Sequence, residues 1–203
     1  MLTSSNYDDD KKKVTGGRNG YGAKLANIFS TEFMVETGDA KRGRTYKQVW
    51  KDNMGVTGEP IIRDDSKAVD FTRVTFYPDL RKFTMEELEE DIVALFCKRA
   101  YDIAGLAGGK VRVSLNGKPI KLQNFGQYVD LYLKNEEHKD LPRITMAKSD
   151  RWEVFCSLSD GAFGQVSFVN SICTTKGGTH VEYIANQIVA EISKQLMKKD
   201  KKL

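Results

Sequence analysis

The sequence lacks the features that mark membrane and secreted proteins. Within its 203 residues, no apolar run approaches the roughly 18 residues that a membrane-spanning helix needs. The amino-terminal stretch, residues 1–13, is polar and does not have the apolar segment of a secretory signal. We therefore expect a soluble protein that is not exported and has no membrane partner.

Cysteine and histidine are scarce. Cys97, Cys156 and Cys173 lie far apart and form no Cys-x-x-Cys pair, which argues against a disulfide framework and against a structural zinc site. The two histidines, His138 and His180, are too few and too widely separated for a histidine-based metal centre. We predict reduced, buried thiols and no metal ligand in this chain.

Neither sign of charge is in large excess. The chain has 32 Lys and Arg against 28 Asp and Glu, a net charge of +4, and a basic surface indicates nucleic-acid binding only where its charges cluster. The hydrophobic fraction of 40% is sufficient for a core. Composition thus predicts one ordinary domain or two small ones and does not specify a function.

Periodicity predicts a mixture of strands and helices. The expected strands cover residues 31–37, 45–50, 71–77, 152–158 and 165–172, with a tight hairpin at Asn116-Gly117. Four helices are expected. The first follows the glycine-rich segment near residue 22, the second begins at the possible capping box Thr84/Glu87, the third at the capping pair Asn124/Gln127, and the fourth at the possible capping box Thr179/Glu182. Gly105 is expected to end the second of these helices, and residues 136–150 are expected to form a loop.

Several conspicuous residues are given structural roles. Residues 52–55 are interpreted as a turn, and the acidic residues 86–91 as the solvated first turns of a helix. Trp50 and Trp152 are predicted core residues. His180 is expected to shape the turn before the last helix rather than to act in catalysis.

The densest functional signal is the segment Gly16-Gly17-Arg18-Asn19-Gly20-Tyr21-Gly22-Ala23-Lys24. Its four glycines allow the backbone to bring successive N–H groups close to an anion, and the helix that follows adds the positive end of its dipole. Arg18 and Lys24 supply positive charge. The segment fits neither the P-loop nor the dinucleotide-binding pattern. It predicts a phosphate-binding loop, with a flexible glycine turn as the alternative.

Further strings occur around this loop in a definite order. Leu2-Thr3-Ser4-Ser5-Asn6-Tyr7-Asp8-Asp9-Asp10 precedes it, and residues 91–95, 99–103, 115–117, 151–154, 167–172 and 176–181 follow it. Together with the loop, these strings resemble the ATPase region of eukaryotic type II DNA topoisomerases over essentially the whole chain. That region belongs to the superfamily of DNA gyrase B, heat-shock chaperones, mismatch-repair ATPases and histidine kinases.

The resemblance implies an α+β fold in two parts. Residues 1–122 would be the C-terminal part of a Bergerat-type ATPase α/β sandwich. Residues 123–203 would be the first part of a ribosomal-S5-like transducer domain, which relays the nucleotide state toward the DNA-gating parts.

The resemblance also implies a set of binding residues. Ser4, Ser5 and Asn6 would contact the ribose and base side of ATP, and Thr72 would lie in the floor of the pocket. The triphosphate would be surrounded by Gly17, Arg18, Asn19, Gly20, Tyr21, Gly22, Ala23 and Lys24. A basic end of the transducer helix that can face DNA would comprise Lys198, Lys199, Lys201 and Lys202.

The resemblance assigns no catalytic residue to this chain. The family's general-base glutamate, Mg²⁺-holding asparagine, switch lysine and DNA-cleaving tyrosine match no position here. We expect an excised piece of an ATP-dependent isomerase that uses ATP and Mg²⁺, clamps double-stranded DNA as a homodimer and works in the nucleus. The piece alone is predicted not to hydrolyse ATP. A non-catalytic phosphate- or nucleic-acid-binding module is the alternative.

Overall fold

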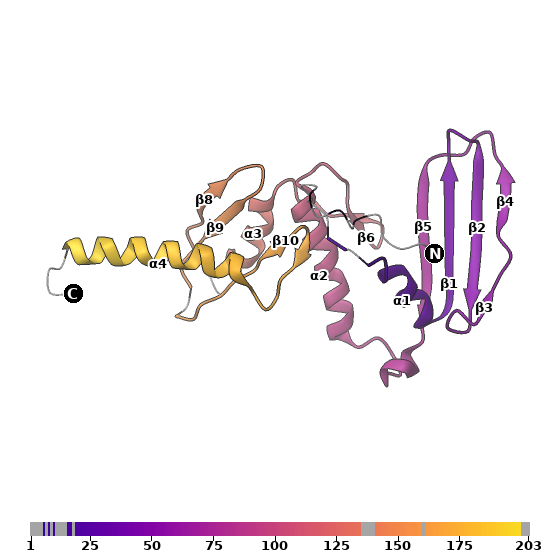
Figure 1. The fold of residues 1–203 in the computed structure, drawn as a ribbon, viewed down its shortest axis with the longest axis horizontal. Helices are drawn as coiled ribbons and strands as arrows, with labels where there is room; N and C mark the ends of the chain where they lie inside the picture. Colours follow the sequence, from indigo (N-terminus) through magenta and orange to yellow (C-terminus); the bar gives the residue numbers. More distant parts are fainter. Residues whose placement is uncertain are drawn as a thin grey trace. The chain divides into compact units, whose positions relative to one another are not determined.

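The computed structural model describes residues 6, 8, 10, 16, 17, 19–134, 141–159 and 161–199. The chain divides into two compact units (Figure 1). The first comprises residues 1–11 and 17–90, and the second comprises residues 12–16 and 91–203. The expected boundary between an ATP-binding and a transducer domain near residue 122 concerns function and stays a prediction.

The first unit consists of one antiparallel sheet with a short helix beside it. The sheet has the order β3-β2-β1-β5, and β4 also pairs with β2. The helix α1 packs against β1 and β5 (Figure 1). The elements of this unit are α1 (Gly22–Ile28), β1 (Ser30–Asp39), β2 (Arg44–Lys51), β3 (Val56–Thr57), β4 (Ile61–Asp64), β5 (Phe71–Pro78) and the 3-10 helix η1 (Leu80–Phe83).

The three central strands, β1, β2 and β5, confirm the strands predicted at residues 31–37, 45–50 and 71–77. Phe33 in β1 is opposite Trp50 in β2 and Phe76 in β5, and it is only 1% exposed. The rings of Phe33 and Trp50 lie 6.0 Å apart, which places the half-buried Trp50 against the core as predicted. Cross-strand aromatic pairs of this kind stabilise and fix the register of a sheet.

The turn after β2 also confirms its prediction. Asp52, Asn53 and Met54 are all left-handed, with φ of 53°, 56° and 68°. The backbone N–H groups of Asp52 and Asn53 donate to Thr31 and Ser30, at 3.0 Å each. These bonds hold the turn against the start of β1, which offsets the cost of positive φ.

The second unit combines helices with very short hairpins. Its elements are α2 (Glu90–Ala107, which starts at the last residue of the first unit), β6 (Ser114–Leu115), β7 (Lys118–Pro119), α3 (Phe125–Leu133), β8 (Ile144–Lys148), β9 (Glu153–Cys156), β10 (Phe168–Val169), β11 (Ile172–Cys173) and α4 (Thr179–Lys199). Strands pair as β6-β7, β8-β9 and β10-β11. With both helices and sheets present, the predicted α+β class is confirmed.

Two local predictions in this unit are confirmed. Asn116 and Gly117 have φ of 50° and 75°, as in a type I′ turn, and they form the tight hairpin predicted there, between β6 and β7. At α3, the N–H of Gln127 donates to the side chain of Asn124 at 2.9 Å, and Gln127 Oε1 accepts from the N–H of Gln123 at 2.7 Å. This reciprocal cap fixes the start of the helix.

The limits of α2 differ from the prediction at both ends. Thr84 is the left-handed residue that ends η1, with φ of 56°, so it caps no helix and α2 begins only at Glu90. Most of the acidic cluster therefore precedes the helix. Gly105 is buried within α2 rather than at its end. Tyr128 packs so closely on it that a Cβ at this position would lie only 2.6 Å from the Tyr128 Cβ. The helix ends at Ala107, before Gly108 with φ of 56°.

Three predictions further along the chain are wrong in part. Residues 144–148, expected in a loop, form β8 and pair with β9. The strand expected at 165–172 is broken by Asn170 and Ser171, whose φ of 49° and 65° turn the chain into the β10-β11 hairpin. Trp152 is 42% exposed beside Tyr183, with ring centroids 6.2 Å apart, so it is no core residue.

The last helix begins without the predicted capping box. Thr179 is its first helical residue, and the N–H groups of Val181 and Glu182 donate to the carbonyl of Gly178. Along this helix the apolar residues Val181, Ile184 and Ile188 are half-buried, whereas Ile192 and Leu196 are more than half exposed, at 54% and 51%.

Two absences concern only the described part of the chain. No helix there is both long and apolar enough to cross a membrane. The three cysteines form no disulfide, and each is half-buried rather than buried as predicted.

Candidate functional site

The glycine-rich loop has a backbone conformation that depends on its glycines. Gly17 and Gly20 have φ of 89° and 67°, a region that side chains other than glycine rarely adopt. The chain then enters α1 at Gly22, directly after Tyr21. Asn19, Tyr21, Gly22 and Ala23 are exposed, and Gly20 and Lys24 are half-buried. Arg18 lies outside the described residues.

A hydrogen bond joins the loop to the other predicted nucleotide segment. The side-chain amide of Asn6 donates from Nδ2 to the carbonyl of Gly17 at 2.9 Å. Two segments assigned to opposite ends of a nucleotide, eleven residues apart in sequence, are therefore in direct contact. Ser4 and Ser5 lie outside the described residues.

Thr72 lies in the same unit, further along the sheet. It occupies β5 opposite Thr37 of β1, toward the end of β1 that is remote from Ser30, where α1 leads into the strand. Its side chain is exposed. Its assignment to the floor of a nucleotide pocket stays a prediction.

In the second unit, the residue that begins the loop packs against a hairpin. A Cβ at Gly16 would overlap the side chain of Ile172 and would lie 3.3 Å from the carbonyl oxygen of Asn170. A larger residue at this position would therefore require the Ile172 side chain, which is 50% exposed, to move aside. Because Ile172 is remote in sequence, inspection of the loop alone could not reveal this contact.

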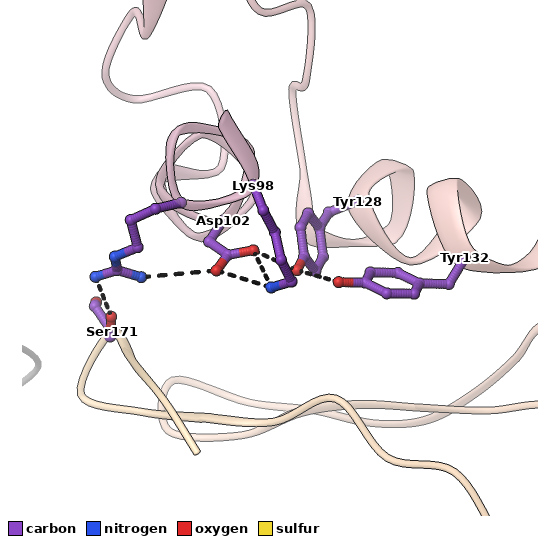
Figure 2. Close-up of polar contacts among 6 residues, drawn as sticks. Lys98, Asp102, Tyr128, Tyr132 and Ser171 are labelled. Carbon is purple, nitrogen blue, oxygen red and sulfur yellow. Dashed lines mark hydrogen bonds and ion pairs between the residues drawn. The ribbon is translucent and has the colours of Figure 1, made fainter. Parts of the chain in front are cut away.

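A buried carboxylate on α2 is the centre of a polar network that reaches α3 (Figure 2). Asp102 on α2 is 3% exposed. It accepts hydrogen bonds from Lys98 Nζ at 3.0 and 3.1 Å and from the Tyr128 hydroxyl on α3 at 2.6 Å. The hydroxyls of Tyr128 and Tyr132 are 2.9 Å apart. Sequence reasoning noted residues 99–103 only as part of the resemblance and missed this role.

The network shifts two protonation equilibria. Burial, and then the hydrogen bond with Asp102, raises the pKa of Tyr128 well above its ordinary value of 10.0. Burial is the largest single influence on Lys98 and opposes its charged form, but the hydrogen bond to Asp102 and the further interactions with Tyr132 and Asp102 together outweigh it, so the pKa of Lys98 is raised above 10.5. Both groups therefore hold their protons at neutral pH, so Tyr128 donates and Lys98 stays cationic.

Arg99 extends this network to the hairpin. Its Nη1 lies 4.0 Å from Asp102 Oδ2, and its Nη2 donates to the carbonyl of Ser171 at 3.1 Å. Phe168 of the same hairpin packs on α3, with its ring centroid 5.8 Å from Tyr128 and 6.2 Å from Phe125. Helices α2 and α3 therefore both hold the hairpin.

The histidine near the last helix occupies a structural cluster. His180 Nε2 lies 3.0 Å from Thr174 Oγ1 and 3.1 Å from Ser167 Oγ, which ties the start of α4 to the chain beside β10 and β11. The arrangement fits the turn-shaping role predicted for it. Within the described ranges, no three His, Cys, Asp or Glu side chains are grouped so that they could hold a metal ion.

The predicted DNA-contact lysines are only partly described. Lys198 and Lys199 lie in the last turn of α4, both exposed, where cations also favour the helix dipole. Lys201 and Lys202 lie outside the described residues. The DNA contact stays a prediction.

Comparison with known sequences gives full-length coverage of the chain. DNA topoisomerase 2 of Arabidopsis thaliana is 58% identical over 205 aligned residues, which cover 99% of this chain and 14% of that protein. DNA topoisomerase 2 of Saccharomyces cerevisiae is 52% identical, covering 100% of this chain and 15% of that protein. The chain thus spans about one seventh of the length of these relatives. Residues 124–203 also match the family described as DNA gyrase B.

Solved structures agree with the sequence matches. The ATPase region of Saccharomyces cerevisiae topoisomerase II superposes with a TM-score of 0.87 at 52% identity, covering 98% of this chain and 52% of that one. The ATPase and transducer domains of DNA topoisomerase II from Balamuthia mandrillaris give 0.87 at 42% identity, covering 100% and 51%. Both proteins are similar to this chain across both of its units.

Proposed function

Since the chain belongs to the type II DNA topoisomerase family and corresponds to part of its ATPase region, we propose that it binds the phosphates of ATP through residues 16–24. The observation that supports this assignment is the hydrogen bond between Asn6 and Gly17, which joins the two segments that the family resemblance assigns to one nucleotide. A flexible glycine turn would need no such partner.

The residues of the loop suit a triphosphate. The positive φ of Gly17 and Gly20 allows backbone N–H groups to converge on phosphate oxygens. Lys24 on α1 adds a cation beside them, and Asn19 adds a neutral hydrogen-bonding side chain. Asn6 braces the Gly17 carbonyl, which leaves the N–H groups of the loop as the donors. When bound, Mg²⁺ would neutralise phosphate charge, but the family resemblance gives no residue of this chain as its ligand.

Nucleotide binding by the 203-residue chain tests this assignment. We expect a non-hydrolysable ATP analogue to bind in isothermal titration and Lys24→Ala to weaken binding about tenfold or more, because it removes a charge-assisted contact. Lys67→Ala, an exposed lysine between β4 and β5, is the matched control and should bind as the unaltered chain does. Equal affinities for the two variants would contradict the proposal.

Hydrolysis by this chain alone is not expected. A general base typically contributes about 10² to 10⁴ in rate, and the family's base matches no position here. A phosphate-release assay with Mg²⁺ should therefore give the background rate. Mg²⁺-dependent turnover that Lys24→Ala abolishes would show the opposite.

The activity of the longer relatives suggests the setting of this binding step. We propose that the complete protein is an ATP-dependent isomerase of DNA that acts as a homodimer on double-stranded DNA in the nucleus. Residues 123–203 would pass the nucleotide state onward, and the lysines at 198, 199, 201 and 202 would face DNA. If so, DNA affinity should fall steeply with salt, and replacing these lysines by Gln should reduce the slope.

A further inference from the structure

We propose that Arg99 is a positioning residue that fixes Gly16, the first residue of the glycine loop, by holding the tip of the β10-β11 hairpin. All the contacts that carry this inference lie within the second unit. Its consequence for ATP rests on the proposed function, but its effect on Gly16 does not.

The tip of the hairpin is a strained turn held from outside. Asn170 and Ser171 both have positive φ, at 49° and 65°, and neither is glycine, so the turn costs free energy that other contacts must offset. The hydrogen bond from Arg99 Nη2 to the Ser171 carbonyl, at 3.1 Å, is one such contact. It acts on the residue next to Ile172.

Arg99 is itself held by a rigid carboxylate. Its other terminal nitrogen faces Asp102 at 4.0 Å, and Asp102 is buried and fixed by Lys98 and Tyr128 (Figure 2). The planar guanidinium can therefore span the carboxylate and the carbonyl with two nitrogens at once. A lysine at this position has one nitrogen and cannot span both.

The hairpin in turn constrains the loop. The Ile172 side chain occupies the space into which a Cβ at Gly16 would project. Gly16 is bonded directly to Gly17, the residue whose carbonyl accepts from Asn6. The contact with Ile172 thus restricts the conformations of Gly16, the first residue of the loop, and preorganised loops bind ligands more tightly because fewer conformations are lost on binding.

Selective ¹⁵N-glycine labelling of the 203-residue chain measures this directly. In Arg99→Gln the amide signals of Gly16 and Gly17 should shift, and their order parameters should fall from about 0.85 to below about 0.6. Gly43 and Gly117, which lie in turns away from the network, should be unchanged and serve as evidence that both units remain folded. Arg112→Gln, an exposed arginine of the same unit, is the matched control and should leave Gly16 unchanged.

Two further variants keep the test decisive if Arg99→Gln fails to fold. Arg99→Lys should loosen Gly16 as Arg99→Gln does, because the charge remains but the span is lost. Ile172→Ala should loosen Gly16 while leaving Asp102 and its partners intact. Wild-type order at Gly16 in Arg99→Lys, or in Ile172→Ala, would overturn the proposal.

ATP titration of the same variants separates this inference from the proposed function. If the glycine loop is able to bind ATP in only about a third of the Arg99→Gln molecules, the apparent affinity of this variant for ATP should fall about threefold. Unaltered affinity in a variant whose Gly16 is mobile would overturn the functional role of Arg99. If the unaltered chain binds no ATP, the proposed function fails, whereas the order parameters of Gly16 still decide whether Arg99 positions it.

Discussion

The two units of this chain are stabilised in different ways. In the first unit, three strands of eight to ten residues pair around Phe33, with a register shift between Ser30 and Glu32 where β1 meets β5. The short strands β3 and β4 are added beside β2, and ion pairs such as Arg44–Asp64 lie at the exposed surface. In the second, strands have two to five residues, and a buried carboxylate links two helices and a hairpin. Long paired strands are stable with few buried polar contacts, whereas short hairpins depend on side-chain contacts from neighbouring elements that hold them in place.

The largest effect is expected from the apolar centre of the first unit. Phe33→Ala should lower the free energy of unfolding by about 3–5 kcal/mol, because it leaves a cavity at a fully buried ring. Urea denaturation followed by hydrogen exchange should assign the loss to β1, β2 and β5. Val74→Ala, at an exposed position of β5, is the control and should cost far less. Similar losses for the two variants would mean that Phe33 is not the core of the sheet.

The next effect concerns the carboxylate of the second unit. Asp102→Asn should cost about 2–3 kcal/mol, because Tyr128 and Lys98 lose a buried charged acceptor. Hydrogen exchange should rise in α2, α3 and the β10-β11 hairpin and not in the sheet of the first unit. Asp150→Asn, at an exposed site, should be neutral. A loss spread evenly over both units would contradict the contrast between them.

The hydroxyl of Tyr128 gives a smaller effect with a distinctive pH dependence. Tyr128→Phe should cost about 1–2 kcal/mol at neutral pH through loss of a hydrogen bond. Because the pKa of Tyr128 is raised in the fold above 10.0, the unfolded chain releases this proton first as pH rises, and stability should fall above about pH 10. Chemical denaturation from about pH 7 to about pH 11 should show a shallower alkaline loss in Tyr128→Phe. Tyr183→Phe, at an exposed ring, should keep the full slope.

The smallest effect is expected at the surface of the sheet. Arg44 and Asp64 are paired at 2.9 Å but their side chains are 59% and 85% exposed. Arg44→Gln should therefore change stability by less than about 0.5 kcal/mol. A double-mutant cycle with Asp64→Asn should give a coupling energy in the same range. A coupling above about 1 kcal/mol would show that polar pairs also stabilise the first unit.

Local signals in the sequence are the most reliable guides to this fold. The three long strands, the type I′ turn at Asn116-Gly117 and the cap of α3 at Asn124 are each specified by neighbouring residues, and each is confirmed. The errors occur where a distant contact overrides a local preference. Gly105 lies inside α2, where Tyr128 of α3 packs on it. Thr84 is a different case, because the neighbouring helix η1 already uses it as its end.

In the candidate site, too, features set by neighbouring residues could be predicted, and features set by distant contacts could not. The glycine loop is recognisable in the sequence because its residue types permit the conformation that Gly17 and Gly20 adopt. Its anchors are not recognisable: Ile172 and Ser171 follow the loop by more than about 140 residues, and nothing in their own neighbourhood relates them to Gly16. A buried network such as that of Asp102 is equally hidden, because the sequence shows a charge and not its burial.

The sequence by itself determined the α+β class, the family and the place of the glycine-rich loop, since these depend on residue types and on their order. Only the tertiary structure decided which side chains support that loop. Arg99, Asp102 and Ile172 acquire their roles from burial and from contacts between distant segments, and such contacts form only when the chain has folded.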